Sequence, residues 1–163
     1  MARLNIFAVC FVSLFLYNFA QCSNKALDSN VEVNFVQNLT DFLQQNPGIK
    51  LEPLEKIVKS NDPSTRIQIV HRIGNRIPGD RILAVDSAEK RYNQPQDVRL
   101  NLFYPQTGPG NMIITYLEVQ VDQSTNLSQA FVIKGGIGQR EISIVVESKQ
   151  TLYFNHKASI FGY

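Results

Sequence analysis

The chain has 163 residues, with 16 Lys and Arg against 14 Asp and Glu, which gives a formal net charge of +2 at pH 7. This near balance argues against a nucleic-acid-binding protein, because neutralising phosphates requires a clustered excess of Lys and Arg. The length is that of one domain with a sizeable hydrophobic core.

The N-terminal residues carry Arg3, then an apolar run from Ile6 to Ala20, and then small residues suited to cleavage. Residues 1–22 are therefore interpreted as a secretory signal peptide, cleaved after Cys22 or, alternatively, after Ala20. No stable membrane anchor is expected, because the run is shorter than the roughly 20 apolar residues of a membrane span. Removing this segment discards both cysteines. We therefore expect a secreted, extracellular protein that folds without a disulfide.

Two Asn-x-Ser/Thr sequons, at Asn38 and Asn126, would be glycosylation sites in a secreted glycoprotein. Asn126 is the better candidate because its surroundings, "VDQSTNLSQ", are typical of an exposed loop.

Residues 25–62 are predicted to form a helical N-terminal extension. Apolar residues recur at three- and four-residue steps up to Leu43, and a following Asn-Pro-Gly would end this helix. A second short helix would have Pro53 in its first turn and end at "SNDPS". Together the two helices would form an amphipathic hairpin. It could pack on the following domain, or serve as a partner-binding or propeptide-like arm.

After Ser64 the hydrophobic period changes to 2, which is typical of strands. Turn sequences such as "IPGD", "YPQTGPGN", "DQSTN" and "KGG" separate the alternating segments. The segments are "RIQIVHRI", "RILAV", "VRLNLFY", "MIITYLEVQVD", "QAFVI", "EISIVVES" and one within "TLYFNHKASIFGY". The pattern predicts a mainly β domain over residues 66–163, an antiparallel sandwich or barrel of about seven strands.

The stretch "KGGIGQ" at 134–139 does not fit a phosphate-binding loop. It lacks the third glycine of a dinucleotide fingerprint, and Lys134 precedes the glycines, unlike the lysine of a Walker loop. A hairpin turn or bulge that needs positive φ at Gly135, Gly136 or Gly138 is expected instead.

No catalytic, cofactor or metal site is predicted. His71 and His156 lack metal-ligand spacing, and His71 falls on an apolar strand face, where a buried core histidine is expected. A triad such as Ser143, His71 and Asp80 would depend on geometry rather than composition, so we expect a non-enzymatic protein without a cofactor.

Charged side chains along the predicted strands are expected to face water. Glu141 and Glu147 share one strand face, which favours a solvated edge over a catalytic pair. A basic stretch is expected on a solvated strand face and turn, with an anionic-ligand surface as the alternative. Its residues are Arg66, Arg72, Arg76 and Arg81.

In "RIPGD", Pro78 pre-sets φ and Gly79 can take a positive φ, which predicts a type II turn in which Asp80 bonds nearby backbone. Near the end of the chain, Gly162 follows Phe161 and is predicted to lie at the end of a strand.

Three motifs carry a family resemblance: "RIGNRIPGDRIL" at 72–83, "KGGIGQREISIVVESK" at 134–149 and "IFGY" at 160–163. With the alternating strands between them, the chain resembles, over about residues 66–163, the arthropod family named for the transcription activator multiprotein bridging factor two. The resemblance implies a small β-rich domain without known catalytic residues. The family name refers to a coactivator that bridges a DNA-binding regulator to the general transcription machinery.

Two functions follow. The leading hypothesis is a secreted, non-enzymatic β-domain protein that binds a protein or a small apolar ligand, but no nucleic acid. The alternative is the transcription coactivator that the family name implies. The N-terminal apolar run and the two sequons favour the first.

Overall fold

In the computed structural model, the described residues are 28–33, 44, 47–59, 66–106 and 110–163. They contain eight strands of one antiparallel sheet, with the order β1-β5-β8-β6-β4-β3, while β7 pairs with β8 and β2 pairs with β7. The strands are β1 (Asp28–Val33), β2 (Glu52–Pro53), β3 (Glu55–Val58), β4 (Ile67–Gly74), β5 (Arg81–Tyr104), β6 (Ile114–Gln123), β7 (Ser128–Gly135) and β8 (Ile142–Gly162). The prediction of a mainly β, antiparallel fold is confirmed.

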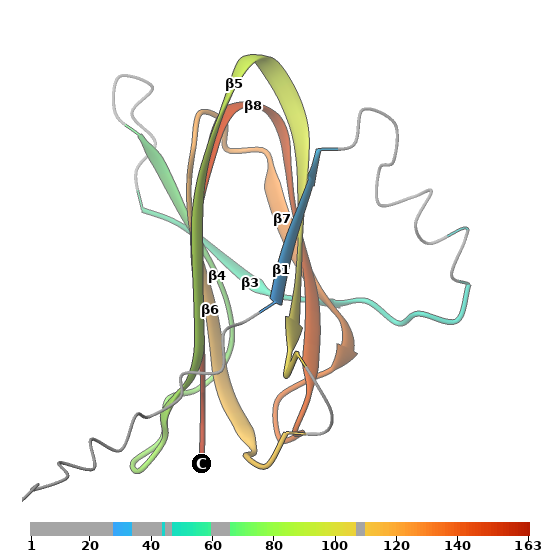
Figure 1. Ribbon diagram of the computed structural model, residues 1–163, viewed down its shortest axis with the longest axis vertical. Helices are drawn as coiled ribbons and strands as arrows, with labels where there is room; N and C mark the ends of the chain where they lie inside the picture. The colour runs from blue at the N-terminus through green and yellow to red at the C-terminus, as the bar shows by residue number, and fades with distance from the viewer. Residues whose placement is uncertain (1–27, 34–43, 45–46, 60–65, 107–109) are drawn as a thin grey trace, which may run out of the picture.

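The two longest strands, β5 and β8, fold over together at one end of the molecule (Figure 1). Residues 81–91 of β5 pair with residues 153–162 of β8, and residues 96–104 of β5 pair with residues 142–151 of β8. The pairing is therefore continuous on both sides of the bend.

The bend lies where the regular ladder is interrupted. The register shifts between Arg91, Gln96 and Val98, and such bulges bend a strand and increase its twist. On β8, Gln150 has a φ of 54°, and its backbone N–H donates to Asp97 Oδ1 at 2.9 Å. These irregularities let both strands pass from one layer of a sandwich to the other.

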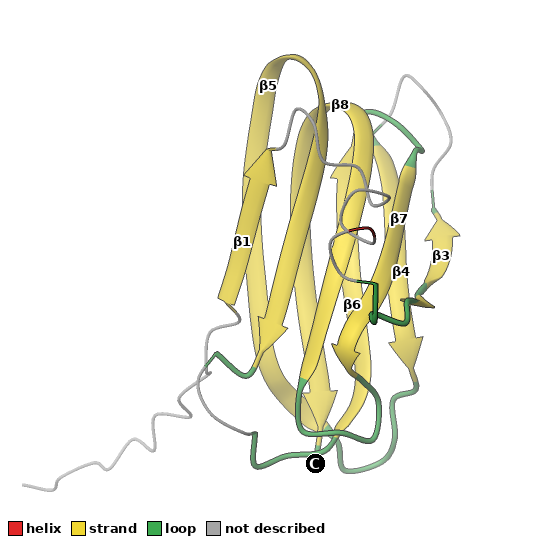
Figure 2. Cartoon of the chain, turned by 90° about the vertical axis from the view of Figure 1, so that its right-hand side faces the viewer, coloured by secondary structure: helices red, strands yellow, loops and turns green. Residues whose placement is uncertain are grey.

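The bend divides the sheet into two layers. Layer I comprises β3, β4, β6, the first half of β5 and the second half of β8. Layer II comprises β1, β2, β7 and the other halves of β5 and β8, and it faces the viewer in Figure 2.

The facing sides of the two layers form one apolar core. Alternation along β6 places Leu117, Val119 and Val121 inside, each with no exposed surface, and Phe154 of β8 is 1% exposed. Side chains of layer II complete the core, including Val98, Leu100, Leu102, Ile142, Ile144 and Val146. Burial of these apolar faces is the main term that holds the layers together.

The segment 52–58 closes the open side of the sandwich. Its first part, β2, pairs with β7 in layer II, and its second part, β3, pairs with β4 in layer I. Between them, Leu54 is 6% exposed and its N–H donates to the Ala130 carbonyl at 2.9 Å. One short strap thus joins the free edges of both layers.

The strand segments predicted by sequence are joined differently in the structure. "RILAV" and "VRLNLFY" are the two halves of β5, and "EISIVVES" and the C-terminal segment are the two halves of β8. Neither linking stretch contains a glycine. The chain therefore stays extended and bends through bulges instead of reversing in a turn.

The predicted helical extension over 25–62 is wrong for most of its described residues. Residues 28–33, 52–53 and 55–58 are strands, Gln44 alone has a helical conformation, and the greater part of the first predicted helix lies outside the described residues. Pairing of these short segments with β5, β7 and β4 overrides their helical periodicity. Within the described part of the chain, no helix is long and apolar enough to cross a membrane.

The closing strap can be tested at its buried leucine. Leu54→Ala should lower the free energy of unfolding by about 2–5 kcal/mol, because it leaves a cavity between the layers. Leu152→Ala is the matched control, since Leu152 is 44% exposed, and it should change stability by less than about 0.5 kcal/mol. Urea denaturation measures both. Equal losses for the two variants would contradict a sealing role for Leu54.

Candidate functional site

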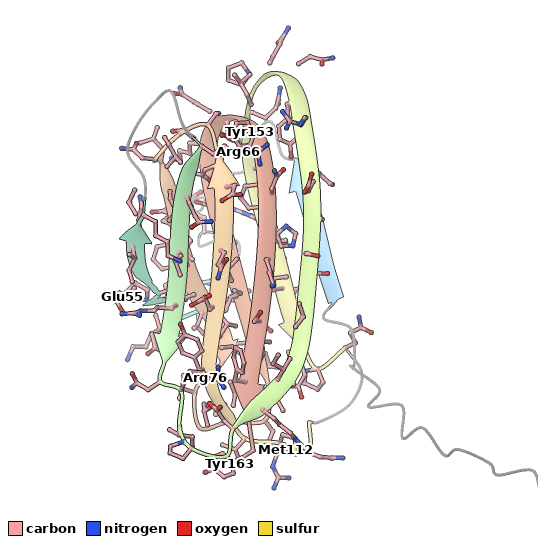
Figure 3. All side chains as sticks on the ribbon, turned by 90° about the vertical axis from the view of Figure 1, so that its left-hand side faces the viewer. Glu55, Arg66, Arg76, Met112, Tyr153 and Tyr163 are labelled. Atoms are coloured by element: carbon pink, nitrogen blue, oxygen red, sulfur yellow. The ribbon has the colours of Figure 1, made fainter. Side chains whose placement is uncertain are left out.

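Three turns that are far apart in sequence meet at the end of the sandwich opposite the bend. They are the β4–β5 turn (75–80), the segment preceding β6 (110–113) and the β7–β8 turn (136–141), and the chain terminates beside them. We call this region, together with Tyr163, the motif end. In Figure 3 the labels of Arg76, Met112 and Tyr163 mark it, at the end opposite Arg66 and Tyr153.

Backbone hydrogen bonds hold the motif end together. Tyr163 and Ile113 exchange two of them, with N···O distances of 3.0 and 2.7 Å. The Gly138 N–H donates to the Ile114 carbonyl at 2.8 Å, and the Ile114 N–H donates to the Gln139 carbonyl at 2.8 Å. The β7–β8 turn and Tyr163 are therefore fixed to the segment that leads into β6 and not only to their own strands.

The β4–β5 turn reverses the chain within four residues. The Asp80 N–H donates to the Ile77 carbonyl at 3.2 Å, and Gly79 has a φ of 88°. Both features fit a type II turn with Pro78 and Gly79 at its centre.

Asp80 is the electrostatic centre of this turn. The Arg76 Nε–H is shared between both carboxylate oxygens, each 2.9 Å from Nε, and Oδ1 also accepts from Arg76 Nη2 at 2.7 Å. The carboxylate also accepts from the Ile77 N–H and the Thr115 hydroxyl, each at 3.1 Å. The hydrogen bonds from Arg76, above all, lower the pKa of Asp80 to about 2. The Arg76 guanidinium also lies 3.7 Å from the centre of the Phe161 ring, a cation–π contact that joins the turn to β8.

A shallow hollow of about 260 Å³ opens between the turns. Most of the residues with large side chains that line it are apolar: Ile77, Ile113, Ile114, Ile137 and Tyr163. Three of these are well exposed, Ile77 at 41%, Ile137 at 37% and Tyr163 at 57%. A rigid end of the molecule thus presents clustered apolar side chains to the solvent, which is the usual mark of an interaction surface.

The β7–β8 turn has the geometry of a backbone reversal. Gly135, Gly136 and Gly138 have φ values of 68°, 144° and 79°, and the Gly136 N–H donates to the Glu141 carbonyl at 3.0 Å. A strand, not a helix, follows, so no helix N-terminus faces this turn. Lys134 forms an exposed ion pair with Glu141 at 3.3 Å.

The two histidines lie in different environments. His71 is buried, with Nε2 2.8 Å from Ser128 Oγ, and burial, followed by the charge of Lys56, lowers its pKa to about 4. His156 Nε2 lies 2.7 Å from Asp86 Oδ2. Across the described ranges, no group of three or more His, Cys, Asp or Glu side chains is placed to hold a metal ion.

The structure does not assemble the triad considered from sequence. Ser143 lies in β8, His71 in β4 and Asp80 in the β4–β5 turn, and no hydrogen bond joins them among the described residues. His71 bonds to Ser128 instead.

One carboxylate expected at a solvated edge is buried. Glu147 is 6% exposed and accepts from Arg99 Nη2 at 2.7 Å and from Gln129 Nε2 at 3.0 Å. β5 and β7 flank this part of β8, so that Arg99, Glu147 and Gln129 share one cross-strand row. Only the strand register shows this row, and the register was not visible in the sequence.

The basic stretch and the sequons also have definite positions. Arg72 forms an exposed ion pair with Glu55 at 2.8 Å, and Arg66 and Arg81 are exposed. Asn126 is exposed at the β6–β7 turn, whereas Asn38 lies outside the described residues.

The lowered pKa of Asp80 predicts a pH dependence of stability. A carboxylate whose pKa is lower in the folded than in the unfolded chain stabilises the fold above the unfolded value, near 3.8, and this stabilisation is lost as the pH falls through about 2. Asp80→Asn should therefore flatten this part of the profile. Urea unfolding at a series of pH values checks it, and an unchanged profile in the variant would contradict the role of Asp80.

Gly135, at the end of β7, and Gly138, in the β7–β8 turn, form a matched pair. Both have positive φ, but a Cβ at Gly135 would lie 2.1 Å from the Glu141 carbonyl oxygen, whereas a Cβ at Gly138 would meet nothing within 4 Å. Gly138→Ala should cost about 1–2 kcal/mol from backbone strain alone, and Gly135→Ala should cost clearly more. Thermal unfolding ranks them. A larger loss of stability for Gly138→Ala than for Gly135→Ala would show that the contact with the Glu141 carbonyl oxygen does not restrict residue 135.

A family model described as "Transcription activator MBF2" matches residues 73–162, more than half of the chain. All three turns of the motif end lie within this match. No curated protein and no solved structure matches the chain.

This match corrects the leading functional hypothesis. A transcription activator acts inside the nucleus, so the expectations of a secreted, extracellular glycoprotein with a signal peptide are contradicted. Residues 1–22, on which secretion was inferred, lie outside the described residues. The match over 73–162 and the motifs within it show that the chain belongs to the transcription activator MBF2 family.

Proposed function

We propose that this protein is a transcription coactivator that bridges a DNA-binding regulator to the general transcription machinery and acts by binding proteins rather than by catalysis. One observation carries the proposal beyond the family itself. The three turns of the matched region come together at the motif end and expose the apolar hollow between Ile77, Ile137 and Tyr163.

The composition of the hollow supports a protein partner. Protein interfaces typically have aromatic and apolar side chains at their centre and polar side chains around the rim. Here Arg76 and Asp80 lie beside Ile77 on the same turn and supply polar groups next to the apolar hollow. The hydrogen bonds between the turns hold these side chains in place before binding. Less conformational freedom is then lost on association, which favours affinity.

Size and shape favour a protein over a small apolar ligand. The hollow measures about 260 Å³, whereas sites for small molecules usually enclose about 300–1,000 Å³. The interior of the sandwich is occupied by core side chains such as Phe154, Leu117 and Ile160. An open, shallow surface of this kind fits a protruding apolar side chain of another protein.

Charge supports protein binding rather than DNA binding. The net charge of the chain is +2, and Arg76, the cation closest to the hollow along the chain, is neutralised by Asp80. Contact with a duplex normally needs several Lys and Arg side chains free to neutralise phosphates. The DNA contact therefore belongs to the regulator that the coactivator joins.

A tethering experiment tests this function. The full chain is fused to a heterologous DNA-binding domain and expressed with a reporter that carries the matching site. The fusion should activate the reporter, and the double variant Ile77→Asp, Ile137→Asp should lower activation at least about tenfold, the effect of losing roughly 1.4 kcal/mol of interface energy.

Leu152→Asp is the control, because Leu152 is similarly exposed, at 44%, but lies at the bend. It should leave activation unchanged, and thermal unfolding of each variant checks that the fold persists. A fusion that never activates the reporter, or equal losses for both sets of variants in folded proteins, would contradict the proposal.

A further inference from the structure

A second hollow, also of about 260 Å³, lies at the β6–β7 turn, away from the motif end. Lys56 of β3 and Lys149 of β8 contribute its two positive charges, and Leu127 and Ser128 line it from the turn and the start of β7. It therefore combines residues from three separate parts of the chain, brought together where the strap closes the sandwich.

Backbone carbonyls of the β6–β7 turn accept hydrogen bonds from the Lys56 ammonium and from the Lys149 main chain. Lys56 Nζ donates to the Asn126 carbonyl at 2.6 Å, and the Lys149 N–H donates to the Leu127 carbonyl at 2.9 Å. β3 is further fixed by its pairing with β4. Lys56 thus carries its charge on a paired strand, and Lys149 carries its charge on β8 beside the β6–β7 turn.

The negative charge that lines this hollow is already neutralised. Glu147 binds Arg99 at 2.7 Å and accepts from Gln129 at 3.0 Å. Lys56 and Lys149 therefore leave a local excess of positive charge. Beside them, the Leu127 side chain is 51% exposed.

We propose that this hollow binds a carboxylate-rich peptide segment of a protein partner, with its acidic side chains on Lys56 and Lys149 and an apolar side chain on Leu127. The inference rests on the proposed function, because a bridging protein needs a second binding surface apart from the motif end. Charge complementarity selects an acidic occupant, and the exposed leucine selects one that also carries apolar side chains.

The small number of lysines favours a peptide over nucleic acid. Two lysines neutralise few phosphates, whereas duplex binding depends on many such contacts. Partial burial lowers the pKa of Lys56, and any anionic group close to its ammonium, a carboxylate or a phosphate, would oppose that effect.

A direct binding measurement tests the inference on the full chain. The probe is a fluorescein-labelled peptide that alternates aspartate and leucine, and its partner probe replaces every aspartate by asparagine. Fluorescence anisotropy should show binding of the acidic peptide, weakened by added salt, and much weaker binding of the asparagine peptide. Lys56→Gln and Lys149→Gln should each raise the Kd about two- to fivefold, the usual range for one exposed ion pair.

Lys134→Gln is the matched control, because Lys134 is an exposed lysine at the opposite end of β7. It should leave the Kd unchanged, and thermal unfolding confirms that each variant is folded. Equal binding of the acidic and asparagine peptides would overturn the inference. An equal rise in the Kd for Lys56→Gln, Lys149→Gln and Lys134→Gln would also overturn it. Binding of duplex DNA that weakens with Lys56→Gln and Lys149→Gln, without binding of the acidic peptide, would overturn it in favour of a nucleic-acid surface. This assay involves no reporter. A lack of peptide binding would therefore not affect the result of the tethering experiment, which tests the motif end.

Discussion

The pairing of β5 with β8 along almost their whole length is the constraint on which the rest of the structure depends. Arg81 at the start of β5 lies opposite Gly162 at the end of β8, and Tyr104 at the end of β5 lies opposite Ile142 at the start of β8. Because both strands bend over together, these two ends of the ladder return to the same end of the sandwich. The "RIPGD" turn, the glycine turn and the C-terminus therefore meet there as a consequence of one strand pair.

This arrangement separates stability from recognition. The core between the layers and the strap at Leu54 hold the scaffold, while the two hollows use side chains that the scaffold leaves exposed. At the motif end, the carboxylate of Asp80 fixes the β4–β5 turn through Arg76 and Thr115, so that Ile77 is displayed on a rigid support. Preformed surfaces of this kind would favour the proposed binding of partner proteins, because less conformational freedom is lost on association.

The fold class was predictable because period-2 alternation is a local signal, and it is present in every segment from β4 to β8. Three features depend on tertiary context and were not predictable. The sequence indicates separate strands for the halves of β5 and of β8, and a helix for the segment 55–58, which in fact pairs with β4. It also favours a solvated edge for Glu147, although Arg99 faces this residue across the sheet. The turn motifs of the motif end can be identified in the sequence. That these turns lie together at one end of the sandwich depends on the register of β5 on β8.

The most direct test of the motif end as a protein-binding surface is site-specific photocrosslinking during reporter activation. A photoreactive phenylalanine derivative replaces Ile137 at the motif end or, in the control, Leu152 at the bend, in the full chain fused to a DNA-binding domain. We expect a crosslink from position 137 to a component of the transcription machinery. This crosslink should be absent from position 152 and should be lost with Ile77→Asp. The same crosslinks from both positions, or none from position 137 while the reporter is active, would contradict it.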